Sequence, residues 1–381
     1  MFNPQLTKIG IIGGGQLGKM MTQAAKKMGF YVIVLDPTPN CPAGQVADSQ
    51  IVGDFFDKEK LRELVSQSDI TTFDIERADE SLIGLVKGGH LIYPFPQILG
   101  LIQNKLKQKE ILTKNNIPTL RYIKVKGNIN SLVKKFGFPV VQKACQGGYD
   151  GRGVFVIKSK RDIKKAIKRE SFLEEYIDIE KELAINIARN KKGEIKCHPV
   201  VEMSFDKRAN ICDWIIAPAR VSTKIKKEVE KIGIKTIKVL GEGAVGIFGI
   251  EMFLAKEGKI LVNEIAPRPH NSGHYTIEAC ITSQFEQHIR AITGLPLGST
   301  DLIIPAVMIN ILGEPGYEGK AILKGIREAL SISGLSLYWY GKAITKPFRK
   351  MGHITIIDKD VRIAIKKAKK IKEILKVISK R

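Results

Sequence analysis

The sequence contains few cysteines, and they follow no recognisable spacing. The five cysteines are scattered along 381 residues without a C-x-x-C pair, which argues against a disulfide framework and a structural zinc site. No apolar run approaches the roughly 18 residues that a membrane span needs, and the N-terminus lacks the apolar core and cleavage site of a signal peptide. We therefore expect reduced thiols, no membrane association and a cytoplasmic location.

Acidic residues are scarce beside basic ones. The chain has 62 Lys and Arg residues against 39 Asp and Glu, which gives a formal net charge of +23. This charge invites a nucleic-acid interpretation, but the lysines are spread along the whole chain, and zinc-finger spacing, an aromatic RNA-binding signature and an isolated basic arm are all missing. We expect no nucleic-acid partner, although a basic protein attracts phosphate-bearing substrates.

Length and texture predict more than one domain. Residues 7 to about 100 alternate apolar strand-like runs with helical stretches at 16–28 and 57–67, which is typical of a parallel sheet with crossover helices. Short strands separated by Gly, Lys and Asn turns follow, which predicts an antiparallel-rich α+β region. These strands are expected at 139–145, 153–158, 172–177, 182–189, 194–203, 212–217, 246–255 and 259–265. A smaller unit begins near residue 305.

The chain closes with a basic amphipathic segment, VRIAIKKAKKIKEILKVISKR. Its apolar residues recur at helical spacing and predict one long helix with a lysine face. They are Val361, Ala364, Ile365, Ala368, Ile371, Leu375 and Ile378. Such a helix can lie on a membrane, but packing against its own domain is the favoured interpretation.

The segment KIGIIGGGQLGKMM, residues 8–21, has the form of a dinucleotide-binding fingerprint. An apolar strand leads into Gly13, Gly15 and Gly18 in a G-x-G-x-x-G arrangement, and a helix follows. Asp36 ends the next apolar run, where an acidic residue would bind a ribose. Taken alone, the motif predicts NAD or flavin. An NAD-dependent oxidoreductase also needs a hydride-transfer site, and we find none in the sequence.

A second segment, GIEMFLAKEGKILVNEIAPRPHNSGH, predicts two glutamates face to face. If residues 256–259 form the turn of a hairpin, Glu251 and Glu264 lie equally far from its centre and stand opposite each other. Like charges directly opposed destabilise a ladder, so a positive group must neutralise them. A lysine is one candidate, and a magnesium ion that shares carboxylate oxygens with substrate phosphates is the other.

Two further segments carry groups that suit a nucleotide triphosphate. In QKACQGGYDGRGVFVI, residues 142–157, the glycine-rich loop is longer than a hairpin needs, and Lys143 stands at its base. Backbone amides in such a loop can cover phosphate oxygens. The segment FLEEYIDIEKEL, residues 172–183, adds carboxylates near a strand end. These features predict an ATP site that is not a P-loop, because G-x-x-x-x-G-K-[ST] is absent.

In this order the segments resemble the ATP-grasp superfamily and, more closely, the 5-(carboxyamino)imidazole ribonucleotide synthase family. The resemblance rests on GGGQLGKM, KACQGGYDGRG, GIFGIEMFL, VNEIAPRPHNSGHYTIEACITSQFEQHIRAITGLPLG, PAVMINILGE and YGK...RKMGHIT. It implies a combined α/β and α+β fold. The expected parts are a Rossmann-like preATP-grasp domain (1–103), an ATP-grasp domain (104–304) with a glycine-rich lid subdomain at about 132–177, and a small C-terminal domain (305–381).

The resemblance also implies which residues bind ATP and magnesium. Glu174 would accept from the adenine amino group, the Ile177 amide would meet the ring and Glu182 would bind the ribose. The full implied ATP set is Lys105, Lys143, Gly148, Tyr149, Asp150, Gly151, Arg152, Gly153, Val154, Glu174, Glu175, Tyr176, Ile177, Glu182, Glu202, Asn263 and Glu264. Glu251 and Glu264 would hold Mg²⁺.

For the other substrates the resemblance implies no dinucleotide at the glycine turn, which instead helps to hold the phosphate of 5-aminoimidazole ribonucleotide. The implied contacts of this nucleotide are Gly15, Gln16, Leu17, Glu76, Tyr149, Asp150, Lys342 and Arg349. Bicarbonate and carboxyphosphate would meet Arg268, His270, Asn271 and Ser272. Asp150, Arg268 and Lys143 are the expected catalytic residues, with Asp150 managing the amine proton.

The implied reaction joins ATP, bicarbonate and 5-aminoimidazole ribonucleotide through carboxyphosphate, with Mg²⁺ and without NAD or biotin, in a homodimer. One alternative is another ligase of the superfamily, such as a formate-using transformylase or a biotin carboxylase. A second alternative is a scaffold protein without catalytic activity. The chain departs from the family pattern F-E-x-E-[NH], because it has Asp74 and Arg77 within Phe73-Asp74-Ile75-Glu76-Arg77.

Overall fold

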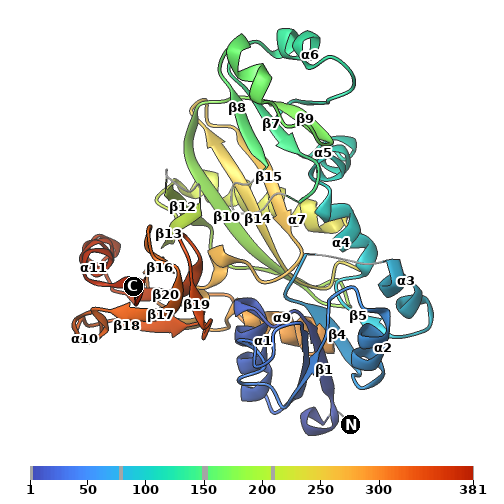
Figure 1. Ribbon diagram of the computed structural model, residues 1–381, viewed down its shortest axis with the longest axis vertical. Helices are drawn as coiled ribbons and strands as arrows, with labels where there is room; N and C mark the ends of the chain where they lie inside the picture. The colour runs from blue at the N-terminus through green and yellow to red at the C-terminus, as the bar shows by residue number, and fades with distance from the viewer. Residues whose placement is uncertain (1–2, 77–79, 148–152, 207–210, 381) are drawn as a thin grey trace.

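The computed structural model describes residues 3–76, 80–147, 153–206 and 211–380 (Figure 1). The first elements are η1 (Pro4–Leu6), β1 (Lys8–Ile12), α1 (Gln16–Lys27), β2 (Tyr31–Asp36), β3 (Ser49–Val52), α2 (Lys58–Ser66), β4 (Ile70–Phe73), α3 (Glu80–Lys87), β5 (Leu91–Ile92) and α4 (Pro96–Gln103). The strands form a parallel sheet in the order β3-β2-β1-β4-β5. This confirms the predicted Rossmann-like start.

A four-stranded antiparallel sheet lies at the opposite end of the molecule (Figure 1). Its strands are β6 (Tyr122–Lys124), β7 (Val140–Ala144), β8 (Val154–Ile157) and β9 (Ser171–Glu175). The helices of the same stretch of chain are α5 (Lys105–Lys114), α6 (Ile129–Phe136) and η2 (Lys160–Lys165). The strand order is β6-β9-β7-β8. The sheet therefore takes in β6, which precedes the lid range that the sequence suggested.

The largest sheet joins the middle of the chain to its C-terminal part. It contains β10 (Ile179–Arg189), β11 (Ile195–Cys197), β12 (Val201–Asp206), β13 (Ile211–Ala217), β14 (Gly246–Ala255), β15 (Ile260–Ala266), β16 (Ala306–Leu312), β18 (Leu335–Trp339) and β20 (Lys350–Ile357). Their order is β15-β14-β10-β12-β13-β16-β20-β18, with β11 on β10. The predicted strand 194–203 is wrong, because β11 ends before Pro199, which has no N–H for a ladder.

Helices and a small sheet complete the chain. They are α7 (Thr223–Val239), η3 (Asn271–Gly273), α8 (Thr276–Ala279), α9 (Gln284–Thr293), β17 (Gly319–Lys324), α10 (Ile326–Leu330), β19 (Ile344–Thr345), α11 (Val361–Ile374) and β21 (Lys376–Ser379). The predicted last helix is too long: it ends at Ile374, and β21 pairs with β17 instead. Ala364, Ala368 and Ile371 pack into the C-terminal core, as predicted. No described helix is long and apolar enough to cross a membrane.

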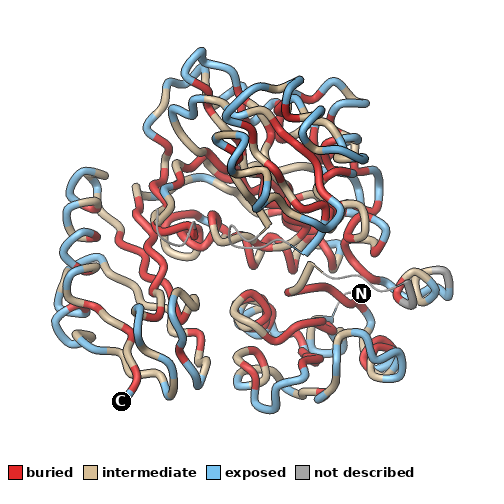
Figure 2. Tube along the Cα trace, turned by 45° about the horizontal axis from the view of Figure 1, so that its top comes forward, coloured by how far each residue is buried: buried red, intermediate tan, exposed pale blue. Residues whose placement is uncertain are grey.

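Helix α9 packs on the N-terminal sheet although it follows the middle region in sequence. Phe285, Ile289 and Ile292 share one buried cluster with residues of β1, β2 and α1. His288 of α9 bonds to Thr72 of β4 through Nε2 (2.7 Å) and accepts from the Ile247 amide at Nδ1 (3.1 Å). Figure 2 shows buried segments of chain in the interior of each part of the molecule. The three parts are therefore held together by shared core.

Candidate active site

The glycine turn between β1 and α1 is held by two aspartates. Gly13 has φ +101°, which only glycine adopts easily. Asp36 accepts from the Gly14 amide through Oδ2 (2.8 Å) and from Thr38 through Oδ1 (2.8 Å), so it shapes the turn. Asp74 lies on the other side, since a Cβ at Gly15 would come within 2.6 Å of its Oδ2. Both carboxylates therefore accept hydrogen bonds from backbone amides of the glycine turn or of the start of α1.

The N-terminal end of α1 already faces a carboxylate. Burial raises the pKa of Asp74 to about 6, against the opposing effects of the Arg268 charge and of the Gly18 and Gly15 amides. Lys342 of the C-terminal part adds a smaller lowering effect. The motif predicts that a phosphate binds at this end of the helix, but the carboxylate of Asp74 already lies there. Asp74 would repel a phosphate bound to the same amides.

The hairpin of β14 and β15 places Glu251 directly opposite Glu264, as predicted. The turn itself differs from the prediction, because Ala255 pairs with Lys259 across a three-residue loop in which Gly258 has φ +83°. If the pairing continued unchanged from this turn, Glu251 and Glu264 would not stand opposite each other. A bulge at Asn263 shifts the strand by one residue and restores the pair. It also turns Asn263 toward the same side, where its amide donates to Glu251 (3.4 Å).

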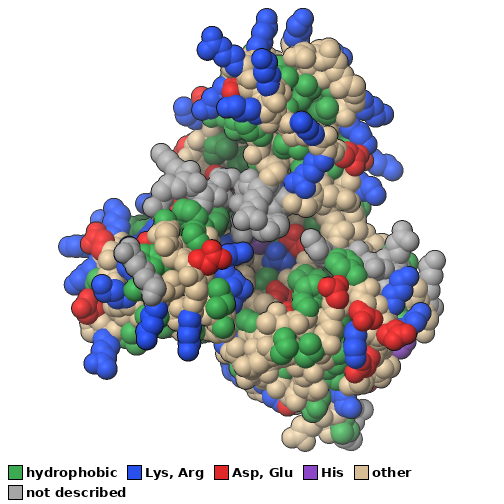
Figure 3. All heavy atoms as spheres, in the orientation of Figure 1, with side chains coloured by type: hydrophobic (Ala, Val, Ile, Leu, Met, Phe, Trp, Pro, Cys, Tyr) green, Lys and Arg blue, Asp and Glu red, His purple; other side chains and the backbone are tan. Residues whose placement is uncertain are grey.

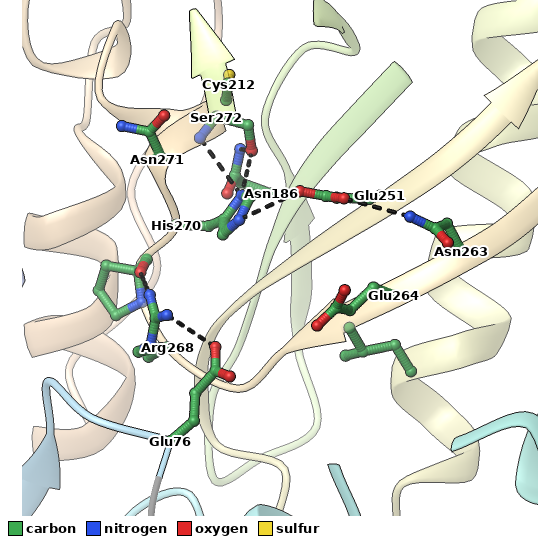
Figure 4. A network of polar contacts seen from close by, with 12 residues as sticks. Glu76, Asn186, Cys212, Glu251, Asn263, Glu264, Arg268, His270, Asn271 and Ser272 are labelled. Carbon is green, nitrogen blue, oxygen red and sulfur yellow. Dashed lines mark hydrogen bonds and ion pairs between the residues drawn. The ribbon is translucent and has the colours of Figure 1, made fainter. Parts of the chain in front are cut away.

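The two glutamates have different partners (Figure 4). Glu264 forms an ion pair with Lys105 at the start of α5 (2.7 Å). Glu251 lies between Asn263 and His270, whose Nε2 is 3.5 Å from Oε1. Burial raises the pKa of Glu251 to about 8, and the charges of Glu264 and Glu182 add to this effect. A carboxylate in this position is stabilised by a bound cation.

Lys143 projects from β7 toward this pair. Its Nζ donates to Asn263 Oδ1 (2.9 Å) and forms an ion pair with Glu174 (2.6 Å). Glu174 also contacts Lys109, a residue that the sequence interpretation missed, and is only 1% exposed. Its side chain therefore takes two lysines as partners in place of the adenine amino group that the resemblance implies. Glu175 next to it accepts from the Arg121 amide (2.7 Å).

The face of the sheet decides which other acidic residues belong to the site. Residues paired across neighbouring strands point to the same side. Glu182 pairs with Phe253, two residues from Glu251, so it shares the face of the paired glutamates. Burial raises its pKa to about 7. Glu202 pairs with Leu183 on the opposite face and binds Arg220 (2.5 Å) and Lys181 (3.0 Å), so it points away from the paired glutamates.

The segment after β15 carries the predicted bicarbonate residues (Figure 4). Arg268 forms an ion pair with Glu76 of the N-terminal part (2.8 Å). His270 Nδ1 lies 2.8 Å from Ser272 Oγ, and Ser272 is fully buried. Asn271 is tied to Asn310 of β16 by two reciprocal hydrogen bonds (2.9 and 2.8 Å). The structure thus joins these residues in one network at the junction of the three parts.

Three buried amides that hold this segment were not predicted. Asn186 of β10 donates to Ser272 Oγ (3.1 Å), and Gln284 of α9 accepts from the His270 amide (2.9 Å) while donating to its carbonyl (2.8 Å). Asn310 also donates to the Cys212 carbonyl (2.7 Å). Asn186 and Asn310 interrupt otherwise apolar runs, LAINIA and AVMINIL. A lone amide in such a run was the available signal, because buried polar groups require partners.

The C-terminal part carries the two predicted cations Lys342 and Arg349, and the charge of Lys342 reaches Asp74 at the glycine turn. Lys19 of α1 donates to the Tyr340 carbonyl (3.2 Å), which docks the loop before Lys342 on this helix. Lys342 donates to the Lys350 carbonyl (2.9 Å), and Arg349 donates to the Ile344 carbonyl (2.6 Å). Figure 3 shows charged side chains of both signs in the hollow where the three parts meet.

Several predicted residues lie outside the described part of the chain. They are Gly148, Tyr149, Asp150, Gly151 and Arg152 of the glycine-rich loop, and Arg77. Of the same loop, Gly153 has φ +80° and its carbonyl accepts from Ala144 (2.8 Å), while Val154 pairs with Lys143. Tyr176 is exposed and Ile177 half-buried just beyond β9.

A Rossmann-like start, a separate lid sheet and paired glutamates beside two lysines define an ATP-grasp ligase. Family models agree: the ribonucleotide synthetase preATP-grasp domain matches residues 6–103, the ATP-grasp domain 110–285, and the phosphoribosylaminoimidazole carboxylase C-terminal domain 306–367. More particularly, the chain belongs to the N5-carboxyaminoimidazole ribonucleotide synthase family.

Its similarity to members of that family extends over almost the whole chain. The N5-carboxyaminoimidazole ribonucleotide synthase of Bacillus subtilis is 40% identical over 355 residues, 92% of this chain and 91% of the relative. The crystal structure of the Thermotoga maritima synthetase has 60% identity and a TM-score of 0.92, covering 98% of this chain and 100% of the other. The phosphoribosylaminoimidazole carboxylase of Ogataea methanolica is 42% identical, and this chain covers 67% of its length.

Proposed function

We propose that this site carboxylates 5-aminoimidazole ribonucleotide in purine biosynthesis. ATP, bicarbonate and the nucleotide give N5-carboxyaminoimidazole ribonucleotide, ADP and phosphate. Family membership supports the reaction, and a relative from Aspergillus clavatus (33% identity, TM-score 0.89) was crystallised with ADP and 5-aminoimidazole ribonucleotide. The observation that carries the proposal is the opposed Glu251 and Glu264 with Lys105 and Lys143 at their side.

ATP binds over the shared face of β10, β14 and β15. Lys105 and Lys143 contact its phosphates, Glu182 accepts from its ribose hydroxyls, and the backbone from Glu175 to Ile177 meets the adenine. Glu251, Glu264 and Asn263 supply the hard oxygen donors that Mg²⁺ prefers, and the raised pKa of Glu251 fits a site built for a cation. The bound metal offsets negative charge on the phosphoryl oxygens.

Bicarbonate is activated where Arg268 and His270 meet the phosphates. A bicarbonate oxygen attacks the γ-phosphorus, the bond to ADP breaks, and carboxyphosphate forms. The amine of the nucleotide then attacks the carboxyl carbon, phosphate leaves and the amine loses a proton. Arg268 holds the developing anion, while Asn271 and Ser272 keep the segment in place through Asn310 and Asn186. Asp150 remains the proposed proton acceptor, and the loop Gly148–Val154 the proposed cover that excludes water.

The nucleotide occupies the junction of the three parts. Lys342 and Arg349 neutralise its phosphate, and Glu76 and Tyr149 contact the remainder. Because Asp74 occupies the end of α1, we place Gly15, Gln16 and Leu17 beside the ribose phosphate and assign its charge to the two cations. The domain limits at 103 and 304, a homodimer and a cytoplasmic location belong to the same proposal.

Phosphate release from Mg-ATP by the purified protein tests this function. Bicarbonate is kept present, and release is compared with and without 5-aminoimidazole ribonucleotide. Strong stimulation by the nucleotide, with a product of the expected mass, supports the assignment. Stimulation by another amine, such as glycinamide ribonucleotide with formate, would instead identify a different ligase of the same superfamily.

A further inference from the structure

Lys109 of α5 is a buried lysine beside the ATP site. Its side chain is 2% exposed, and its ammonium contacts Glu174, donates to Thr119 Oγ1 (2.7 Å) and lies 3.4 Å from the Val262 carbonyl. These partners come from β9, from the loop after α5 and from β15. Lys109 therefore joins the lid sheet to the hairpin of the paired glutamates.

Glu174 stands between two lysines of unequal exposure. One oxygen contacts Lys109 and the other Lys143 (2.6 Å), whose side chain is 12% exposed and leads through Asn263 into the site. Burial alone would raise the pKa of Glu174, but the charges of Lys143 and Lys109 hold it below its usual value. The carboxylate is ionised at neutral pH, and the three groups together carry one positive charge.

The position of that surplus charge determines what the site offers to ATP. If Lys109 were absent, Glu174 would neutralise Lys143, and little positive charge would remain for the phosphates. When Lys109 is present, its buried ammonium neutralises the carboxylate of Glu174. The positive charge of Lys143 then remains available to the phosphates of ATP.

We propose that Lys109 is a positioning residue that neutralises Glu174 and so keeps the charge of Lys143 available to the phosphates of ATP. This rests on the proposed binding of ATP by Lys143. Besides Glu174 and Lys143, Glu264 is the charged group that acts on Lys109, and it lies beyond Val262 on β15. Burial lowers the pKa of Lys109 to about 8, so the lysine is charged at neutral pH.

Calorimetric titration of the full-length protein with Mg-ATP and with AMP separates a phosphate effect from an adenine effect. Lys109→Met keeps the unbranched side chain up to the ε-carbon position and removes the charged ammonium. We expect this variant to bind ATP about 10-fold more weakly and AMP unchanged, since AMP lacks the β- and γ-phosphates. Lys107→Met, two residues away on the exposed side of α5, is the matched control and should bind both nucleotides normally.

A second variant distinguishes charge from packing. In Lys109→Met combined with Glu174→Gln, no carboxylate remains to neutralise Lys143, so ATP binding should return to within about threefold of the unmodified protein. An ATP loss that persists in the double variant, or an equal loss of ATP and AMP affinity in Lys109→Met, overturns the proposal. If Lys109→Met does not fold, the double variant, which buries no unpaired charge at this place, still gives the decisive comparison with Glu174→Gln.

Failure of this inference and failure of the proposed function are distinguishable. The titrations measure ATP binding without turnover, whereas phosphate release stimulated by 5-aminoimidazole ribonucleotide measures the reaction. Normal stimulation with unchanged ATP binding in Lys109→Met rejects the role of Lys109 alone. A protein that binds ATP in the expected pattern but is not stimulated by the nucleotide retains the role of Lys109 and loses the substrate assignment.

Discussion

The proposed ATP half and the proposed nucleotide half of this site, called the ATP half and the nucleotide half below, are built in different ways. The ATP half lies on adjoining strands of one large sheet and on β7 of the lid sheet, where Lys105 contacts Glu264 and Lys143 contacts Asn263. The nucleotide half draws Glu76, Arg268 and Lys342 from three separate parts of the chain. The first half is organised by strand register, and the second only by how the parts pack.

This difference has an electrostatic counterpart. In the ATP half, Lys105, Lys109 and Lys143 each form an ion pair with a carboxylate. In the nucleotide half, Asp74 and Glu76 sit beside Arg268 and within the influence of Lys342. A phosphate entering there must replace carboxylates as the partner of the cations, so its affinity depends on the packing of all three parts.

Removing one of the opposed carboxylates should produce the largest effect. Glu264→Gln loses one metal ligand and the partner of Lys105, so we expect kcat to fall about 10²- to 10³-fold while the fold is kept. Phosphate release measures the loss, and circular dichroism checks the fold. Glu257→Gln, in the exposed turn of the same hairpin, is the control and should retain full activity. Full activity in Glu264→Gln would contradict the metal assignment.

The nucleotide half should respond separately from the ATP half. Lys342→Ala removes one cation from the proposed phosphate contact, so the KM for 5-aminoimidazole ribonucleotide should rise about 10- to 100-fold. The KM for ATP should change less than twofold. Lys346→Ala, exposed four residues further along, serves as the control. Equal rises in both KM values would show that Lys342 supports the site as a whole.

A pH profile of ATP binding sharpens the role of Glu182. Because its pKa is raised to about 7, the carboxyl is largely protonated at pH 6 and ionised at pH 8. Ribose hydroxyls donate better to the ionised form, so ATP binding should strengthen by up to about 10-fold as pH rises through 7. The variant Glu182→Gln should lose this part of the profile and keep the parts due to Glu251 and to ATP itself. Identical profiles would remove Glu182 from the ribose contact.

The smallest expected effect concerns the turn of the hairpin. Gly258 has φ +83°, and a Cβ added there would have no atom within 4 Å, so Gly258→Ala should cost about 1 kcal/mol of unfolding free energy through backbone strain alone. Activity should not change, since the bulge at Asn263 sets the register of the glutamates. Gly193→Ala, at φ +82° in a turn away from the site, should show the same loss. A lower kcat in Gly258→Ala alone would give the turn a part in placing Glu251.

The ATP half could be predicted from sequence further than the nucleotide half. The opposed glutamates follow from hairpin symmetry, although the turn was misplaced by one residue and the bulge at Asn263 compensated. Bulges depend on local hydrogen bonding that spacing does not reveal. The face on which Glu202 lies could not be predicted, because it depends on the pairing of β10 with β12. Lys109 left no signal, because a lysine in a lysine-rich helix looks exposed until tertiary packing buries it.

In the C-terminal region, local pattern and tertiary pairing disagreed. The apolar spacing of Leu375 and Ile378 fits a continued helix, yet Leu375 caps the end of α11 and Ile378 lies in β21, which completes a sheet with β17. Helix propensity is a weak preference that strand pairing readily overrides. The ion pair of Arg268 with Glu76 was likewise beyond prediction, since 192 positions separate the two residues and only domain packing joins them.

The placement of α9 determines what can be exchanged between related ligases. Phe285, Ile289 and Ile292 complete the core of the N-terminal domain, so a fragment that stops at residue 103 would expose an apolar face on both products of the cut. The transplantable module is therefore discontinuous, made of residues 1–103 and the distant helix at 284–293. A chimaera that exchanges only residues 1–103 would pack the new sheet against a helix from the other protein. A chimaera that exchanges residues 1–103 together with 284–293 keeps the original packing between them.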